Sequence, residues 1–185
     1  MKMQSVKSHF APYSILQKRK TTINHAFASA IAPVDEYDEA ICGAALRFLG
    51  QDPNGDLECV YCGSQAETWD HLVGLVEKAE LRGCGHQLGN LVPCCRNCNS
   101  KKGAKSWDVF LKGVAPNEQT FAAKQRLIAS HVDRYSAPVN LKEVAERMPD
   151  EWTRYCEIKR EIFQLMAEAD AIAARLRGIV ASKRV

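Results

Sequence analysis

The sequence predicts an α+β protein in which a short glycine- and cysteine-rich segment lies between two α-helical regions. Apolar residues recur at helical spacing before residue 50 and again after residue 116. The segment 57–104 between them holds six of the eight cysteines. A length of 185 residues, with 46% hydrophobic and 25% charged residues, suits one ordinary domain or a small domain with extensions.

Composition also excludes several classes of protein. The apolar content is too high for a disordered chain, and the length rules out a disulfide-stapled mini-protein. The sequence contains no run of about 18 apolar residues, so no transmembrane helix is predicted. The first residues include Lys2 and Lys7 but no apolar segment or cleavage site, so no export is expected. We therefore expect a cytoplasmic protein with reduced cysteines that act as metal ligands or buried thiols.

The N-terminal part divides by composition. Residues 1–20 lack periodicity and predict a basic arm. Residues 21–50 predict two helices, 21–32 and 35–49, separated by Pro33. The turn-forming sequence at residues 51–55 marks a boundary, and we expect a core domain over 51–112.

Residues 113–185 predict a C-terminal helical region. Ser106 and Asn117 are expected to cap two helices, 140–147 to form a short one, and Pro149 to begin a long last one. Along the last helix apolar residues alternate spacings of three and four, as in a heptad. This stripe either packs on the chain's own N-terminal helices or forms a homodimer; its members are Tyr155, Ile158, Ile162, Leu165, Ala169, Ile172, Leu176 and Ile179.

Charge is unevenly distributed although the net charge is only +3. Residues 34–58 are rich in acids, whereas basic residues cluster in 1–20, in 96–105 and at the C-terminal end. Three basic clusters suit a polyanionic partner such as nucleic acid. The alternative interpretation is that these clusters are solvated faces.

Two Cys-x-x-Cys pairs predict a structural zinc site. Cys59 with Cys62, and Cys95 with Cys98, can each present two thiolates to one ion and so complete a tetrahedral shell. Cys94 is an alternative ligand to Cys95, and Cys84 with His86 could compete for a metal; these alternatives stay open. We prefer Cys95 because it repeats the spacing of the first pair. Cys42 and Cys156 lie on predicted helix faces and are expected in the core.

Between the two pairs lie polar residues whose order is informative. Asp70 and His71 are adjacent, so on a strand they point to opposite faces and can share a site only near a strand end or bend. Gly74 offers such an ending. Asn90 precedes Leu-Val-Pro, and Asn99 follows the second cysteine pair directly, with Lys-Gly shortly after.

In these motifs the segment 57–105 resembles the HNH endonuclease family, whose core has a ββα-metal fold. The resemblance rests on Asp70-His71-Leu72-Val73, on Asn90-Leu91-Val92-Pro93, and on the run from Cys95 to Gly103. Two Cys-x-x-Cys pairs that bracket the hairpin and helix are similar to the zinc-knuckle variant of the family. The sequence differs at Gly74, where the family often has Pro, and in the length of the loop from Gly74 to Gly89.

The resemblance implies a metal-dependent DNA endonuclease that leaves 5′-phosphate and 3′-hydroxyl ends. His71 would be the general base, and Asp70 and Asn99 would hold a catalytic Mg²⁺ or Mn²⁺. Asn90 would brace the hairpin loop and orient His71. DNA phosphates are expected near His86, Arg96, Lys101, Lys102 and Lys105.

Two other functions stay open at this stage. The cysteine pairs could serve a non-catalytic zinc-bearing module that binds nucleic acid or protein. Alternatively the chain could be the nuclease subunit of a partner-dependent complex, for example in restriction or phage defence. No membrane association is expected.

Overall fold

The computed structural model describes residues 3–182; residues 1–2 and 183–185, with part of the basic arm and of the C-terminal basic cluster, lie outside the described residues. The chain divides into two compact units, which are described separately. One comprises Met1–Phe27 with Lys142–Val185, and the other is Ala28–Leu141. The boundaries expected after residues 20, 50 and 112 stay a prediction.

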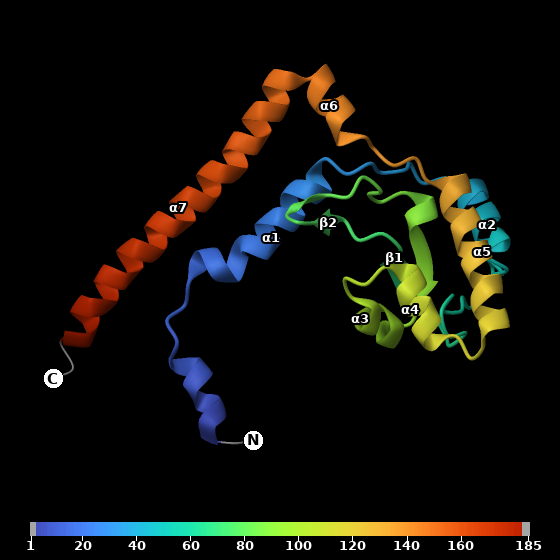
Figure 1. The fold of residues 1–185 in the computed structure, drawn as a ribbon, viewed down its shortest axis with the longest axis horizontal. Helices are drawn as coiled ribbons and strands as arrows, with labels where there is room; N and C mark the ends of the chain where they lie inside the picture. The colour runs from blue at the N-terminus through green and yellow to red at the C-terminus, as the bar shows by residue number, and fades with distance from the viewer. Residues whose placement is uncertain (1–2, 183–185) are drawn as a thin grey trace. The chain divides into compact units, whose positions relative to one another are not determined.

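The unit Ala28–Leu141 is built around a two-stranded antiparallel ribbon (Figure 1). Strand β1 (Thr68–His71) pairs with β4 (Leu91–Cys94), so that Thr68 lies opposite Cys94 and His71 opposite Leu91. Helix α3 (Arg96–Lys102) follows β4 directly and contacts β1. Together with the surrounding helices this confirms the predicted α+β class.

Four helices and a one-turn 3-10 segment flank the ribbon. Their bounds are α2 (Glu39–Phe48), η2 (Leu88–Asn90), α3, α4 (Trp107–Val114) and α5 (Glu118–Tyr135). A second, two-residue hairpin joins β2 (Val76–Glu77) to β3 (Glu80–Leu81).

Side-chain caps decide where two of these helices begin. Asn117 caps α5 as predicted, with its Oδ1 accepting the Thr120 N–H at 2.8 Å. Helix α2 begins at Glu39, later than the expected residue 35, because the Asp38 carboxylate caps it by accepting the Ile41 N–H. Apolar periodicity alone predicts too early a start for this helix, because it carries no information about the Asp38 cap.

The core of this unit lies where the first cysteine turn, the ribbon and helices α4 and α5 meet. Tyr61 and Phe110 pack edge to face there, with ring centroids 5.1 Å apart. Burial of these side chains fixes the ribbon against the helices that follow it. The buried cluster comprises Leu49, Cys59, Tyr61, Leu72, Val92, Cys94, Cys95, Cys98, Phe110, Leu111 and Ile128.

A strap of chain ahead of α2 is paired with the loop between the two strands of the ribbon. The His86 N–H donates to the Pro33 carbonyl, and the Asp35 N–H donates back to the His86 carbonyl. The Asp35 carboxylate also accepts the Leu88 N–H at 2.7 Å. Gly85 has a positive φ of 48°, and a side chain there would collide with Pro33.

The unit of Met1–Phe27 with Lys142–Val185 consists of four helical segments. These are η1 (Met3–Phe10), α1 (Ile15–Ala30, which continues into Ala28–Leu141), α6 (Leu141–Arg147) and α7 (Pro149–Ser182). Helix α7 begins at Pro149 as predicted. Helix α1 begins six residues before the expected start, because the Ser14 hydroxyl accepts the Gln17 N–H at 3.1 Å as a local cap. Asp170 of α7 accepts the N–H groups of Ile15 and Leu16 and so caps the same turn from outside. The predicted arm is thus partly helical.

Candidate functional site

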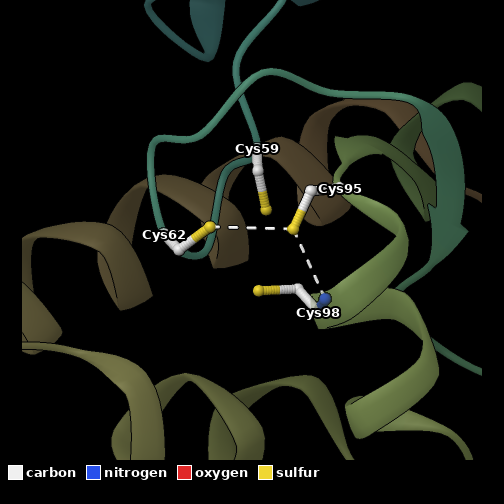
Figure 2. A group of neighbouring side chains, drawn as sticks. All are labelled: Cys59, Cys62, Cys95 and Cys98. Atoms are coloured by element: carbon white, nitrogen blue, oxygen red, sulfur yellow. Dashed lines mark hydrogen bonds between the residues drawn. The ribbon is translucent and has the colours of Figure 1, made fainter.

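Four cysteine side chains form one cluster at the end of the ribbon. The Sγ atoms of Cys59, Cys62, Cys95 and Cys98 all lie within 4.8 Å of one another, and Figure 2 shows them pointing toward a common centre. The two predicted Cys-x-x-Cys turns therefore meet at this cluster. The four side chains could hold a metal ion such as zinc.

The donors of this cluster fit a tetrahedral ion. Zn–S bonds of about 2.3 Å require sulfurs about 3.8 Å apart, and Cys62 and Cys95 are separated by 3.8 Å. Burial raises the pKa of the Cys95 and Cys98 thiols, and neighbouring thiolates raise it further. Several thiolates can therefore share this space only with a cation among them.

Cys94 lies beside the cluster but outside the group of four. It is fully buried, and its Sγ is 3.9 Å from that of Cys59. The hydrogen bond with Cys94 lowers the pKa of the Cys59 thiol to about 4. This geometry favours Cys95 over Cys94 as the fourth ligand, because the Cys95 Sγ belongs to the group of four sulfurs that lie within 4.8 Å of one another and the Cys94 Sγ does not. Cys84 is not in the cluster.

At the opposite end of the ribbon, two histidines face one another. The Nε2 atom of His71, the last residue of β1, is 3.0 Å from the Nδ1 atom of His86 in the loop. Burial lowers the pKa of His71, and the adjacent His86 lowers it further. His71 is therefore neutral near pH 7 and can accept a proton.

Asn90 ties the two ends of the intervening loop together. Its Oδ1 accepts the Val73 N–H at 2.8 Å, while its Nδ2 donates to the carbonyls of Val73 at 3.0 Å and Gly85 at 2.9 Å. The side chain is only 1% exposed. It therefore does not face substrate, and it fixes the segments that carry His71 and His86.

Asp70 points into the core, away from the histidine pair. One carboxylate oxygen accepts the Tyr61 hydroxyl at 2.7 Å, and the other forms an ion pair with the Lys102 ammonium at 3.1 Å. Lys102 also donates to the His71 carbonyl at 2.8 Å. Adjacent strand residues have opposite orientations, and this explains the separation of Asp70 from the His71 ring.

This arrangement corrects the role expected for Lys102. Its side chain is 2% exposed and its charge is neutralised by Asp70, so it cannot contact DNA phosphates. The same pair bears on the divalent ion expected at Asp70 and Asn99. Both oxygens of Asp70 are already bonded, and Asn99 lines an open hollow with Glu67, Thr68, Arg96 and Ser100. As arranged, these donors do not fit a shared ion.

Apart from His86, which contacts His71, the remaining predicted contacts to DNA lie on or just after α3. Lys101 and Lys105 are exposed, and Arg96 is exposed while it pairs with Glu67 at 3.6 Å. His86 also lines a cavity of about 490 Å³, together with Asp35, Glu36, Asp38 and Arg134. Its three carboxylates outnumber the one guanidinium and disfavour a phosphate there, so the exposed cations of α3 suit the DNA backbone better.

Three residues of the site were not predicted from the sequence. Tyr61 sits inside the first cysteine turn and holds Asp70. Lys124 of α5 donates to the carbonyls of Val60 and Tyr61 and so fixes that turn from outside. His131 is 1% exposed and contacts the Leu88 carbonyl at 3.2 Å. Nothing in the sequence pattern distinguishes these residues from ordinary core and surface residues.

Comparisons with protein-family models, with curated proteins and with solved structures find no match to this chain. None of the described helices is long and apolar enough to cross a membrane.

Proposed function

We propose that this chain is an endonuclease that hydrolyses phosphodiester bonds in DNA, with His71 as the general base. The observation that supports this most is the contact between His71 and His86 at the end of β1. It combines a neutral imidazole, a second group that orients it, and a loop fixed by Asn90. The motif order around these residues, which resembles the HNH family, supplies the reaction type.

The tautomers of the two rings follow from the proposed reaction. His71 can accept a proton from water at Nδ1 only if its own proton resides on Nε2. His71 Nε2–H then donates to His86 Nδ1, and His86 carries its proton on Nε2. When His71 becomes an imidazolium in the transition state this hydrogen bond strengthens, so His86 is a positioning residue.

The chemical step then needs few groups from the chain. A water molecule loses a proton to His71 Nδ1 and attacks the phosphorus, and the bond to the 3′-oxygen breaks. The products are a 5′-phosphate and, after protonation of the leaving oxygen, a 3′-hydroxyl. Arg96, Lys101 and Lys105 would hold the backbone, with an affinity that falls as salt rises.

Zinc is proposed as the structural ion of the four-cysteine cluster. The cluster joins the first cysteine turn to the start of α3, which fixes the Cys94 end of the ribbon. A catalytic Mg²⁺ or Mn²⁺ would supply charge stabilisation at the leaving oxygen. The paired state of Asp70 does not fit that ion, so no step is assigned to it.

A second candidate function is a non-catalytic zinc-bearing module that binds DNA. The observation that favours it is the burial of Asp70 against Lys102 and Tyr61, which gives Asp70 a structural reason to be present. The two candidates differ in whether the His71 ring acts on substrate.

Cleavage of plasmid DNA separates the two candidates. Purified protein is incubated with plasmid and Mg²⁺ or Mn²⁺, with and without EDTA, and the His71→Ala variant is compared with the parent. General-base catalysis contributes about 10²–10⁴-fold, so His71→Ala should lose that much rate while its DNA affinity is unchanged. His25→Ala, an exposed histidine of α1, is the matched control and should cleave normally.

Two outcomes would contradict the endonuclease. One is cleavage by His71→Ala at the parent's rate, which would indicate a contaminating nuclease. The other is DNA binding by a folded parent that cleaves under none of these conditions. His86→Gln tests the positioning role, because the pH profile of cleavage should shift while the zinc content stays constant.

A further inference from the structure

Helix α7 carries two apolar stripes, and one of them faces α1. The Tyr155 ring packs on Phe27 with centroids 5.0 Å apart, and its hydroxyl donates to the Phe27 carbonyl. Fifteen residues further along α7, Asp170 accepts the Ser14 hydroxyl at 2.7 Å. Helix α1 therefore runs antiparallel to α7 along this stripe. Ile162, which belongs to the same heptad position as Tyr155, is partly buried.

The second stripe consists of four residues that are seven positions apart. Ile158, Leu165, Ile172 and Ile179 are 37%, 65%, 40% and 59% exposed, and we call this line the outer seam. Leu176 and Val180 extend it with 58% and 61% exposure. A strict repeat of seven keeps one face of a helix directed at a partner helix when the two supercoil. The outer seam spans about 32 Å at 1.5 Å per residue.

The unit that contains α7 has little apolar burial of its own. Among its residues whose burial is described, none of the apolar side chains is buried, and Asn24 is the one buried residue. Helices in proteins derive most of their stability from packing an apolar face. A contiguous exposed line of Ile and Leu marks an interaction surface.

We propose that the outer seam binds the outer seam of a second copy of this chain, in an antiparallel pair. In this arrangement Ile158 lies opposite Ile179 of the other copy, and Leu165 lies opposite Ile172, so every layer is apolar. The proposal concerns α7 alone and does not depend on the nuclease activity.

Charge beside the seam favours the antiparallel direction at two of three positions. Glu161, Glu168 and Arg175 each lie three residues after a seam position, on the same side of the helix, and Glu168 lies beside its own copy at the twofold axis. In the antiparallel pair Glu161 of one copy lies beside Arg175 of the other, twice by symmetry. In a parallel pair these positions are 14 residues, or about 21 Å, apart along the axis. Glu161 is half exposed and contacts Arg154 of its own helix at 2.7 Å, so it already lies at the surface.

Mass measurement tests whether the seam is an interface. Light scattering on the zinc-loaded full chain at about 100 µM should give twice the chain mass of 20.6 kDa. Leu165→Glu should shift the protein to the monomer mass with its helical circular dichroism retained. Val109→Glu, at a 62% exposed apolar position of α4, is the matched control and should remain dimeric. A monomeric parent, or a dimer that survives both Leu165→Glu and Ile172→Glu, would overturn the proposal.

Charge reversal tests the direction of the pair. Glu161→Arg should weaken dimerisation at least tenfold, and adding Arg175→Glu to the same chain should restore it. Arg154→Ala measures how much of the first loss comes from the intrahelical contact. A double variant that is as weak as Glu161→Arg would overturn the antiparallel arrangement, and so would an assembly larger than a dimer.

Discussion

The two ends of the β1/β4 ribbon are organised in different ways. At the Cys94 end the four thiols come from two short turns, and each turn contributes a pair three positions apart. At the His71 end the two imidazoles are 15 positions apart, and a long loop with its own hairpin joins them. Local spacing determines the cluster, whereas hydrogen bonds between distant segments determine the histidine pair. The two ends should therefore respond differently to substitution.

The largest expected effect is at the cluster. Cys95→Ser should lose the metal and unfold Ala28–Leu141, because binding of a structural zinc typically contributes about 10–16 kcal/mol to folding. Metal content and circular dichroism measure both losses. Cys94→Ser should keep its metal, since its sulfur lies outside the group of four. Loss of metal from Cys94→Ser but not from Cys95→Ser would mean that Cys94, and not Cys95, is the fourth metal ligand.

The next effect lies midway along the ribbon. Lys102→Met should lower the free energy of unfolding by about 3–5 kcal/mol, because it leaves the buried Asp70 charge without its partner. Urea denaturation at pH 7 measures the change. Lys101→Met, at the exposed neighbouring position, is the control and should change stability little. Equal stability of the two variants would mean that the ion pair is dispensable.

A smaller loss is expected at the histidine end. Asn90→Ala removes three hydrogen bonds and should cost about 2–4 kcal/mol, since the Val73 N–H loses its acceptor in a buried setting. Hydrogen exchange at Val73 should accelerate while the metal content stays that of the parent. If the metal were lost as well, the two ends of the ribbon would not be independent.

The smallest effect is the response to pH. The pKa of His71 is lowered in the folded protein, mainly by burial, so the unfolded chain binds its proton more readily. The folded state is therefore stabilised at pH values above the ordinary histidine pKa of 6.5, and this contribution is lost as the pH falls below it. Titration of the His71 ring protons by NMR should give a midpoint below 6.5. A midpoint above 6.5 would contradict the burial argument and weaken the case for a neutral base.

Much of the fold follows from local signals in the sequence. The Asn117 cap, the Pro149 start and the two Cys-x-x-Cys turns depend on residues close in sequence, and the structure agrees with each. The start of α1 has a local signal as well, because Ser14 accepts the Gln17 N–H in a Ser-x-x-Gln pattern. Only the contribution of Asp170, which lies 155 residues away, could not be predicted. The burial of Lys102 could not be predicted either, because a lysine in a basic run carries no sign of its partner.

The candidate site shows the same difference between local signals, which the sequence displays, and long-range contacts, which it does not. Asp70 and His71 were identified from their motif, but the sequence did not reveal that one faces the core and the other a histidine. The partner of Asp70 is Tyr61, one of the two residues between Cys59 and Cys62, a position to which the motif assigns no residue type. The contact between His71 and His86 depends on the conformation of the loop, which spacing alone does not specify.

The pairing of the Pro33–Asp35 strap with His86 determines which residues must be kept together if this domain is transferred to another protein. A cassette cut at residues 51 and 112, the bounds expected for the core domain, would leave behind the backbone partners of His86. It would also lose Lys124, which holds the first cysteine turn. A transplant that keeps these contacts has to carry Ala28–Leu141. The flanking helices and the motif-bearing segment therefore form one structural piece, and cuts in the chain should be tolerated outside this range rather than within it.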